Sequence, residues 1–139
     1  MLFRIPGKFN EPETDEWDTI EPSQKPQLGP PVLFQHGLLD SADSWIVNDV
    51  DKAPALIAAE AGYDVWLGNL RGNKYSKTHD YLDSVRNKKE FFDFDIESHT
   101  TIDLVSFIEY ISIETFQEHE KIAYVGHSMG TTVMFRLAA

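Results

Sequence analysis

A serine between two glycines stands at residues 126–130, in the run Gly-His-Ser-Met-Gly. The spacing Gly-X-Ser-X-Gly is typical of a nucleophilic serine held in a sharp turn between a strand and a helix. Gly126 and Gly130 are needed there because side chains at these positions would collide across the turn. An apolar run, Ile122–Val125, leads into the turn, and a helical pattern follows it directly. This context predicts that Ser128 is a nucleophile for attack on an acyl carbonyl.

The sequence His36-Gly37-Leu38-Leu39 follows an earlier apolar run and is the candidate partner of this turn. Attack on a carbonyl creates an oxyanion, which backbone N–H groups can stabilise. One N–H comes from the residue after the nucleophile, here Met129, and the other from the loop after an earlier strand, which indicates Leu38. Gly37 lets the backbone fold close to the substrate. We expect His36 to shape the loop by hydrogen bonding rather than to act as a base.

The other histidines are not predicted to take part in the chemistry. His127 adjoins the nucleophile, which turns its side chain away from the Ser128 hydroxyl and makes it a poor candidate for the general base. We expect His79, His99 and His119 to be exposed on loops or helix surfaces. No carboxylate shows metal-ligand spacing with the histidines, and there is no phosphate-binding glycine pattern. The sequence therefore predicts neither a metal nor a cofactor.

Three short apolar runs are the candidate strands that position these residues, namely Val32–Phe34, Asp64–Gly68 and Ile122–Val125. Each is a continuous run, as expected of a strand buried on both faces of a parallel sheet. Helical patterns separate the runs. Strands that alternate with helices predict an α/β protein with a mostly parallel sheet and right-handed crossovers.

Two of the helical patterns have clear signals. The first begins near Asp51-Lys52-Ala53-Pro54, since proline is tolerated in the first turn of a helix, and Gly62 supplies its stop. Its apolar positions at helical spacing are Ala53, Leu56, Ile57 and Ala61. The second spans roughly residues 97–117, where Leu104, Ile108 and Ile111 lie on one face. A third helix is expected from Met129 onward.

The N-terminal part is predicted to contribute little to the core. Leu2–Ile5 is a short apolar piece closed by Pro6-Gly7, which indicates the end of a strand followed by a turn. The segment Glu11–Pro31 holds five of the seven prolines and many acidic residues, and it reads as an extended surface connection with Trp17 and Ile20 as its contacts to a core. We accordingly divide the chain into residues 1–30, a hairpin remnant with this connection, and residues 31–139, a partial α/β domain.

Composition excludes several classes of function. The chain has 139 residues, 42% of them hydrophobic, which is typical of a globular protein. A formal net charge of −11 argues against a nucleic-acid partner, since phosphate binding needs a basic surface. The absence of cysteine excludes disulfides and thiolate catalysis. No apolar run approaches the length of a membrane span, and residues 1–7 show no signal peptide, so the sequence alone assigns no compartment.

Several separate motifs, in order and at sensible spacings, resemble the acid lipases, the gastric and lysosomal lipase group of the α/β-hydrolase superfamily. The matching segments are Pro30–Ser41, Ala61–Asn73 with Tyr75-Ser76, Glu90–Phe94 and Tyr124–Ser128, and Leu2–Pro6 resembles the end of the family's N-terminal hairpin. The resemblance implies an α/β-hydrolase fold, present here as its N-terminal part and ending just after the turn around Ser128. It also implies hydrolysis of neutral lipid esters such as triacylglycerols or steryl esters at a lipid–water interface. Family members work in lysosomes or secretions.

By resemblance, Ser128 is the nucleophile and the N–H groups of Leu38 and Met129 form the oxyanion hole. Family members commonly have glutamine where this chain has Met129, and Ser-Met-Gly turns also occur in other esterases of the fold. The catalytic Asp and His of the family follow the nucleophile in chain order and lie beyond Ala139. The expectation is therefore a truncated chain, inactive alone. Two alternatives stay open: a non-catalytic lipid-binding or interaction module, and another α/β-hydrolase such as a monoacylglycerol lipase, thioesterase or acyltransferase.

Overall fold

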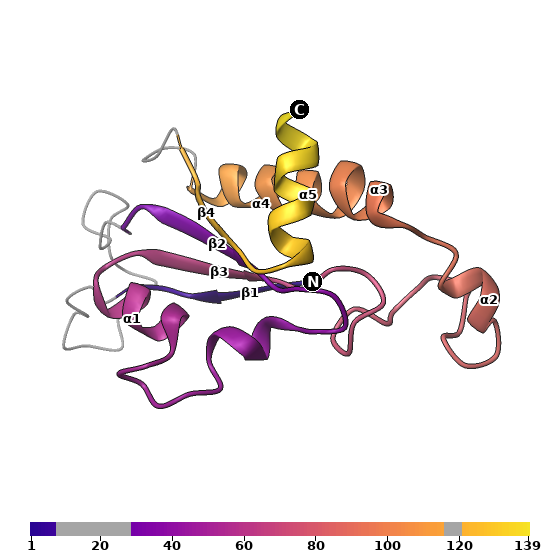
Figure 1. Ribbon diagram of the computed structural model, residues 1–139, viewed down its shortest axis with the longest axis horizontal. Helices are drawn as coiled ribbons and strands as arrows, with labels where there is room; N and C mark the ends of the chain where they lie inside the picture. The colour runs from indigo at the N-terminus through magenta and orange to yellow at the C-terminus, as the bar shows by residue number, and fades with distance from the viewer. Residues whose placement is uncertain (8–28, 116–120) are drawn as a thin grey trace, which may run out of the picture.

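A computed structural model describes residues 1–7, 29–115 and 121–139 (Figure 1). Its centre is a four-stranded sheet in the order β1-β3-β2-β4. The strands are β1 (Leu2–Ile5), β2 (Pro31–Gln35), β3 (Asp64–Gly68) and β4 (Ala123–Gly126). β2 pairs in parallel with both β3 and β4, whereas β1 pairs antiparallel with β3. The predicted α/β class with a mostly parallel sheet is confirmed.

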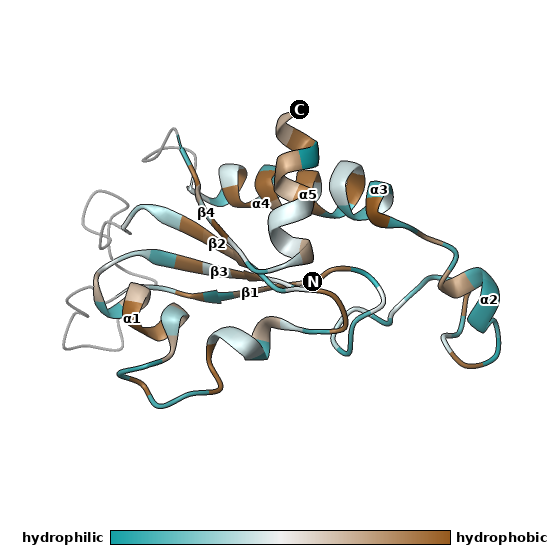
Figure 2. Cartoon of the chain, viewed as in Figure 1, coloured by the Kyte–Doolittle hydropathy of each residue, from teal (hydrophilic) through white to brown (hydrophobic). Residues whose placement is uncertain are grey.

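The two inner strands bury every residue, as their continuous apolar runs predict. Because side chains alternate along a strand, they divide between two cores. Val32 and Phe34 pack with α1 on one face, and Leu33 packs with α4 and α5 on the other. Figure 1 shows α1 on one side of the sheet and α4 and α5 on the opposite side. Figure 2 shows the middle of β2 and β3 as apolar and α2 as mainly hydrophilic.

The helices surround this sheet. Their bounds are η3, a short 3-10 helix (Ala42–Trp45), α1 (Pro54–Glu60), α2 (Lys88–Phe91), α3 (Ile96–Ser98), η4, a π-helical stretch (His99–Leu104), α4 (Val105–Thr115) and α5 (Met129–Ala138). Proline stands in the first turn of α1, as predicted. In the part of the chain that the structure describes, no helix is long and apolar enough to cross a membrane.

The helix expected over 97–117 is confirmed over residues 96–115, which are helical without a break, and the π-helical stretch η4 interrupts the regular period of the α-helix within it. Two sequence predictions need correction. The run Ile122–Val125 is not buried on both faces as expected, because β4 alternates between exposed and half-buried residues. The buried face of α1 carries Ala55 and Ala59 next to Ala53, whereas Ile57 is 47% exposed. Small residues lie inward because they allow the helix to approach the sheet closely. The contacts expected of Trp17 and Ile20 lie outside the described residues.

Candidate active site

The turn between β4 and α5 holds Ser128 in a strained backbone conformation. Its φ is 51° and its ψ is −116°, values that non-glycine residues rarely adopt and that cost about 1–3 kcal/mol. A Cβ added at Gly126 would lie 2.8 Å from the Thr131 nitrogen, and one at Gly130 would lie 2.4 Å from the Gln35 carbonyl oxygen. Both glycines are thus required by close backbone approach, at the positions where the sequence places them.

Side-chain hydrogen bonds fix the shape of this turn. The Thr131 hydroxyl donates to the Gly126 carbonyl at 2.9 Å, and the Tyr124 hydroxyl donates to the Gly130 carbonyl at 2.6 Å. Burial raises the pKa of Tyr124, so the phenol remains a donor at every physiological pH. The Ser128 side chain itself is exposed. The Ser128 side chain therefore lies at the surface, on a turn whose backbone is held by hydrogen bonds at Gly126 and at Gly130.

The loop after β2 lies directly against Ser128. A Cβ added at Gly37 would lie 3.1 Å from the Ser128 Cβ and 3.1 Å from the His127 Nδ1. Leu39 has a φ of 58°, so the loop turns sharply just beyond Leu38. Within the described residues, no carbonyl accepts a hydrogen bond from the backbone N–H of Leu38 or of Met129. Both N–H groups that the sequence proposes for an oxyanion hole are thus unoccupied next to the serine.

His36 is buried at the base of this loop and uses both ring nitrogens. Nδ1 lies 2.7 Å from the Gly37 carbonyl, and Nε2 lies 3.2 Å from the Leu70 nitrogen and 3.1 Å from the Asn73 Nδ2. Because the Leu70 N–H is a donor, Nε2 is the acceptor and Nδ1 carries the proton. Burial lowers the pKa of His36, against the opposing effect of the bond to Gly37. His36 therefore joins the loop after β2 to the loop after β3.

A cavity of about 440 Å³ lies between these two loops. Its apolar lining is Leu38, Leu39, Leu70, Phe92, Phe94 and Met129. Leu38 and Leu39, which stand next to Gly37, are 67% and 98% exposed. The cavity therefore adjoins the Ser128 turn, and it presents an apolar surface both inside and at its edge.

His99 also lines this cavity, and its predicted exposure is wrong: the residue is 7% exposed. Its Nδ1 lies 2.9 Å from Asp103 Oδ2, one helical turn along the same segment. Arg71 bonds the same carboxylate through its backbone N–H and its guanidinium. Burial opposes ionisation of Asp103, but the bonds from His99 and Arg71 prevail and lower its pKa. In the sequence, the signal that could have indicated this pair is the spacing of four residues between His99 and Asp103, which brings two side chains together on one face of a helix.

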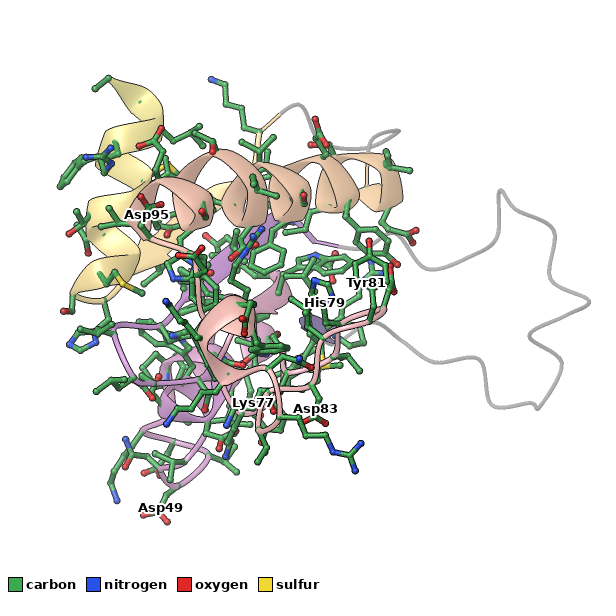
Figure 3. The ribbon with its side chains drawn as sticks, turned by 90° about the vertical axis from the view of Figure 1, so that its right-hand side faces the viewer. Asp49, Lys77, His79, Tyr81, Asp83 and Asp95 are labelled. Carbon is green, nitrogen blue, oxygen red and sulfur yellow. The ribbon has the colours of Figure 1, made fainter. Side chains whose placement is uncertain are left out.

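The remaining histidines lie elsewhere. His79 is exposed, as predicted. Its ring packs edge to face on that of Tyr81, with ring centroids 5.0 Å apart, and Figure 3 shows the two residues side by side. His127 is exposed, and His119 lies outside the described residues. In the described ranges, Ser128 Oγ has no histidine hydrogen-bonded to it, and no group of three or more His, Asp or Glu side chains could hold a metal.

Comparison with known proteins agrees with this fold. The family model described as the alpha/beta hydrolase fold matches residues 30–139, and the model of a partial alpha/beta-hydrolase lipase region matches residues 1–49. The class defined by the sheet and the serine turn is thus that of the α/β hydrolases. The chain belongs to the α/β-hydrolase fold family, and within it the resemblance to the acid lipases is confirmed.

The similar relatives are lipases. The chain is 47% identical to lipase member J of Homo sapiens over 75% of this chain and 27% of that protein. It is also 47% identical to the gastric triacylglycerol lipase of Mus musculus, over 76% of this chain and 26% of that protein. An epoxide hydrolase mutant from Vigna radiata matches in structure with a TM-score of 0.46 and 24% identity, over 79% of this chain and 28% of that one. The chain spans about a quarter of the length of the curated relatives it matches.

Proposed function

We propose that the protein is a carboxylic ester hydrolase that acts on neutral lipids through Ser128. The serine oxygen attacks the ester carbonyl carbon, a general base takes its proton, and the alcohol leaves with a proton as the acyl-enzyme forms. Water then attacks the acyl-enzyme, which releases the carboxylic acid and restores the hydroxyl of Ser128. The N–H groups of Leu38 and Met129 stabilise the oxyanion in both steps.

One observation carries this proposal above the others. The strained Ser128 lies against Gly37, in a place where the N–H groups of Leu38 and Met129 have no other acceptor among the described residues. A serine that only ended a strand would need neither the strain nor two free donors beside it. Strain of this kind gathers at functional sites, where the surrounding structure holds it in place.

The lipid substrate is supported by the surface around the serine. Leucine, phenylalanine and methionine side chains form the apolar part of the cavity lining and suit an acyl chain, beside polar and charged residues such as Asp40, Arg71 and Lys74. Leu38 and Leu39 are exposed next to the proposed oxyanion hole, so they can contact a lipid–water interface. The relatives named as lipases, among them a gastric triacylglycerol lipase, favour a triacylglycerol or similar ester.

The general base is a separate question from the nucleophile. His36 does not fit that role, because both of its ring nitrogens already have partners. In α/β hydrolases the base is a histidine that follows the nucleophile and the acid in chain order. In this chain we assign the nucleophile to Ser128 and the oxyanion hole to Leu38 and Met129.

Covalent labelling of the full-length natural protein tests the assignment of Ser128. A fluorophosphonate probe should modify Ser128, and peptide mass spectrometry should locate the adduct there. The Ser128→Ala variant should lose the label, while Ser106→Ala, which removes an exposed serine of α4, should keep it. Labelling that persists in Ser128→Ala, or a folded protein that takes no label at neutral or acidic pH, would refute the proposal.

A further inference from the structure

Basic residues gather in one stretch of this acidic chain. Residues 71–89, here called the basic stretch, hold six of the twelve Lys and Arg residues and only two of the 23 Asp and Glu residues. The six are Arg71, Lys74, Lys77, Arg86, Lys88 and Lys89. Arg71 and Lys74 form ion pairs with Asp103 and Asp43. The side chains of the other four are exposed and, within the described residues, form no ion pair or hydrogen bond.

The basic stretch lies beside the cavity next to Ser128. Lys77 and Phe92 both line that cavity. Lys88 begins α2, and the Phe92 N–H donates to the Lys88 carbonyl at 3.1 Å, so these two residues stand one helical turn apart. Figure 1 shows α2 standing away from the sheet, at one end of the molecule. The unpaired basic side chains therefore belong to a projecting part of the surface that adjoins the candidate site.

The acidic residues that follow the basic stretch adjoin a different cavity. Glu90 and Asp93 line a neighbouring cavity of about 300 Å³, together with Asp103. The cavity next to Ser128 is instead lined by three basic residues and one acidic residue: Arg71, Lys74, Lys77 and Asp40. The chain as a whole has a formal net charge of −11. An anionic surface would thus repel most of this protein and attract the part around the cavity, which fixes the orientation of approach.

The apolar residues around the same cavity are exposed at a cost in free energy. Leu39 is 98% exposed and has a φ of 58°, a backbone conformation that is unfavourable for leucine. Leu38 and Phe92, which line the cavity with Leu39, are 67% and 37% exposed. Apolar side chains exposed next to unpaired basic ones are typical of surfaces that bind lipids with anionic headgroups.

We propose that this face of the protein binds to a lipid surface that carries anionic phospholipid headgroups. Leu38, Leu39 and Phe92 contact the acyl chains, and the four unpaired basic side chains lie among the headgroups. The cavity and Ser128 then face the lipid that holds the ester. The role of this binding in catalysis rests on the proposed function, whereas the binding itself can be measured without hydrolysis.

Vesicle binding by the full-length natural protein tests the proposal, with Ser128→Ala as the background so that no ester is consumed. Vesicles of equimolar phosphatidylcholine and phosphatidylglycerol should bind the protein about a hundredfold more tightly than vesicles of phosphatidylcholine alone, since each basic residue near such a surface contributes about fivefold. Lys88→Gln/Lys89→Gln should lower this preference by about tenfold to thirtyfold. Lys88→Arg/Lys89→Arg, which keeps both charges, should retain it.

A matched double variant separates this face from the net charge of the protein. Lys52→Gln/Arg136→Gln removes the same number of positive charges from exposed ion pairs outside the basic stretch. It should change the preference by less than about twofold, because salt screens charges that lie far from the bound surface. Leu39→Asn, whose side chain tolerates a positive φ, should weaken binding to both kinds of vesicle by about fivefold.

Equal binding to the two kinds of vesicle would overturn the proposal, and so would equal losses in the two double variants at unchanged melting temperature. Binding to neither kind of vesicle would also overturn it, and would favour an acidic protein as the partner of this face. The fluorophosphonate label on Ser128 remains the separate test of the proposed function. A labelled protein without the anionic preference keeps that function and loses this binding surface, whereas an unlabelled protein with the preference does the reverse.

Discussion

The two neighbours of β2 in the sheet are supported very differently. On one side, β3 is fully buried, pairs with β1 as well as β2, and leads into a loop with many internal hydrogen bonds. On the other side, β4 alternates between exposed and half-buried residues and, in the part of the chain that is described, pairs with β2 alone. The loop after β2, which holds the proposed oxyanion-hole residue Leu38, is bonded to the β3 side, whereas Ser128 belongs to the β4 side.

The difference shows how the two halves of the candidate site are held. Leu38 stands on a loop that His36 and Asn73 tie to the buried strand β3. Ser128 is held by bonds within its own turn and by contact of that turn with β2. We therefore expect damage on the β3 side to cost more folding free energy than comparable damage on the β4 side, even though the proposed nucleophile lies on the latter.

The largest effect is expected from the ion pair that fixes β1 to β3. Arg4 bonds Asp64 through two nitrogens, at 2.8 and 2.9 Å, and Asp64 is completely buried. Among the described residues, Arg4→Met leaves that carboxylate with only the Trp66 Nε1 as a side-chain donor. Removing one partner of a buried pair costs about 3–5 kcal/mol, and the partial exposure of Arg4 places this case near 3 kcal/mol. Chemical denaturation measures the loss.

An ion pair on the other side of the sheet supplies the control. Arg136 of α5 pairs with Glu97 of α3, and about half of each side chain is exposed. Arg136→Met should cost about 1 kcal/mol or less, since exposed pairs contribute little. Equal losses in the two variants would contradict the contrast between the β3 and β4 sides.

A second, smaller effect is expected at the loop connection. His36→Leu keeps the apolar volume but leaves the Leu70 N–H and the Gly37 carbonyl without their ring partners. Unsatisfied buried groups of this kind cost about 1–3 kcal/mol. His127→Leu, at an exposed position of the Ser128 turn, should change the free energy of unfolding by less than about 0.5 kcal/mol. A larger loss for His127→Leu than for His36→Leu would reverse the comparison.

On both sides, the sequence could predict the features that depend on neighbouring residues and could not predict contacts between distant ones. β2, β3 and the glycines around Ser128 follow from local patterns, because an apolar run and a tight turn each depend on neighbouring residues. The partners of His36 lie 34 and 37 residues further along the chain, at Leu70 and Asn73, and no local pattern shows them.

His99 was mispredicted for a related reason. A polar residue in a helical pattern is usually exposed, and the regular period gave no sign of the π-helical stretch that begins at His99. Asp103, which bonds His99 Nδ1, is itself bonded by Arg71 from the loop after β3, 32 residues earlier in the chain. No local pattern shows a contact of this kind.

The smallest expected effect is a pH dependence that belongs to the β3 side. Burial lowers the pKa of His36 in the folded protein below the ordinary value of 6.5. As pH falls below 6.5, the unfolded chain therefore takes up the proton first, so the His36 contribution to stability declines until the lower folded pKa is passed. His36→Leu lacks this titration. Chemical denaturation at each pH gives the free energy of unfolding of both proteins. The difference between the natural protein and His36→Leu should become smaller as the pH falls from about 7 to about 5. A difference that stays constant or widens would mean that the folded protein takes up the proton on His36 as readily as the unfolded chain, and that the ring is not held neutral between the two loops.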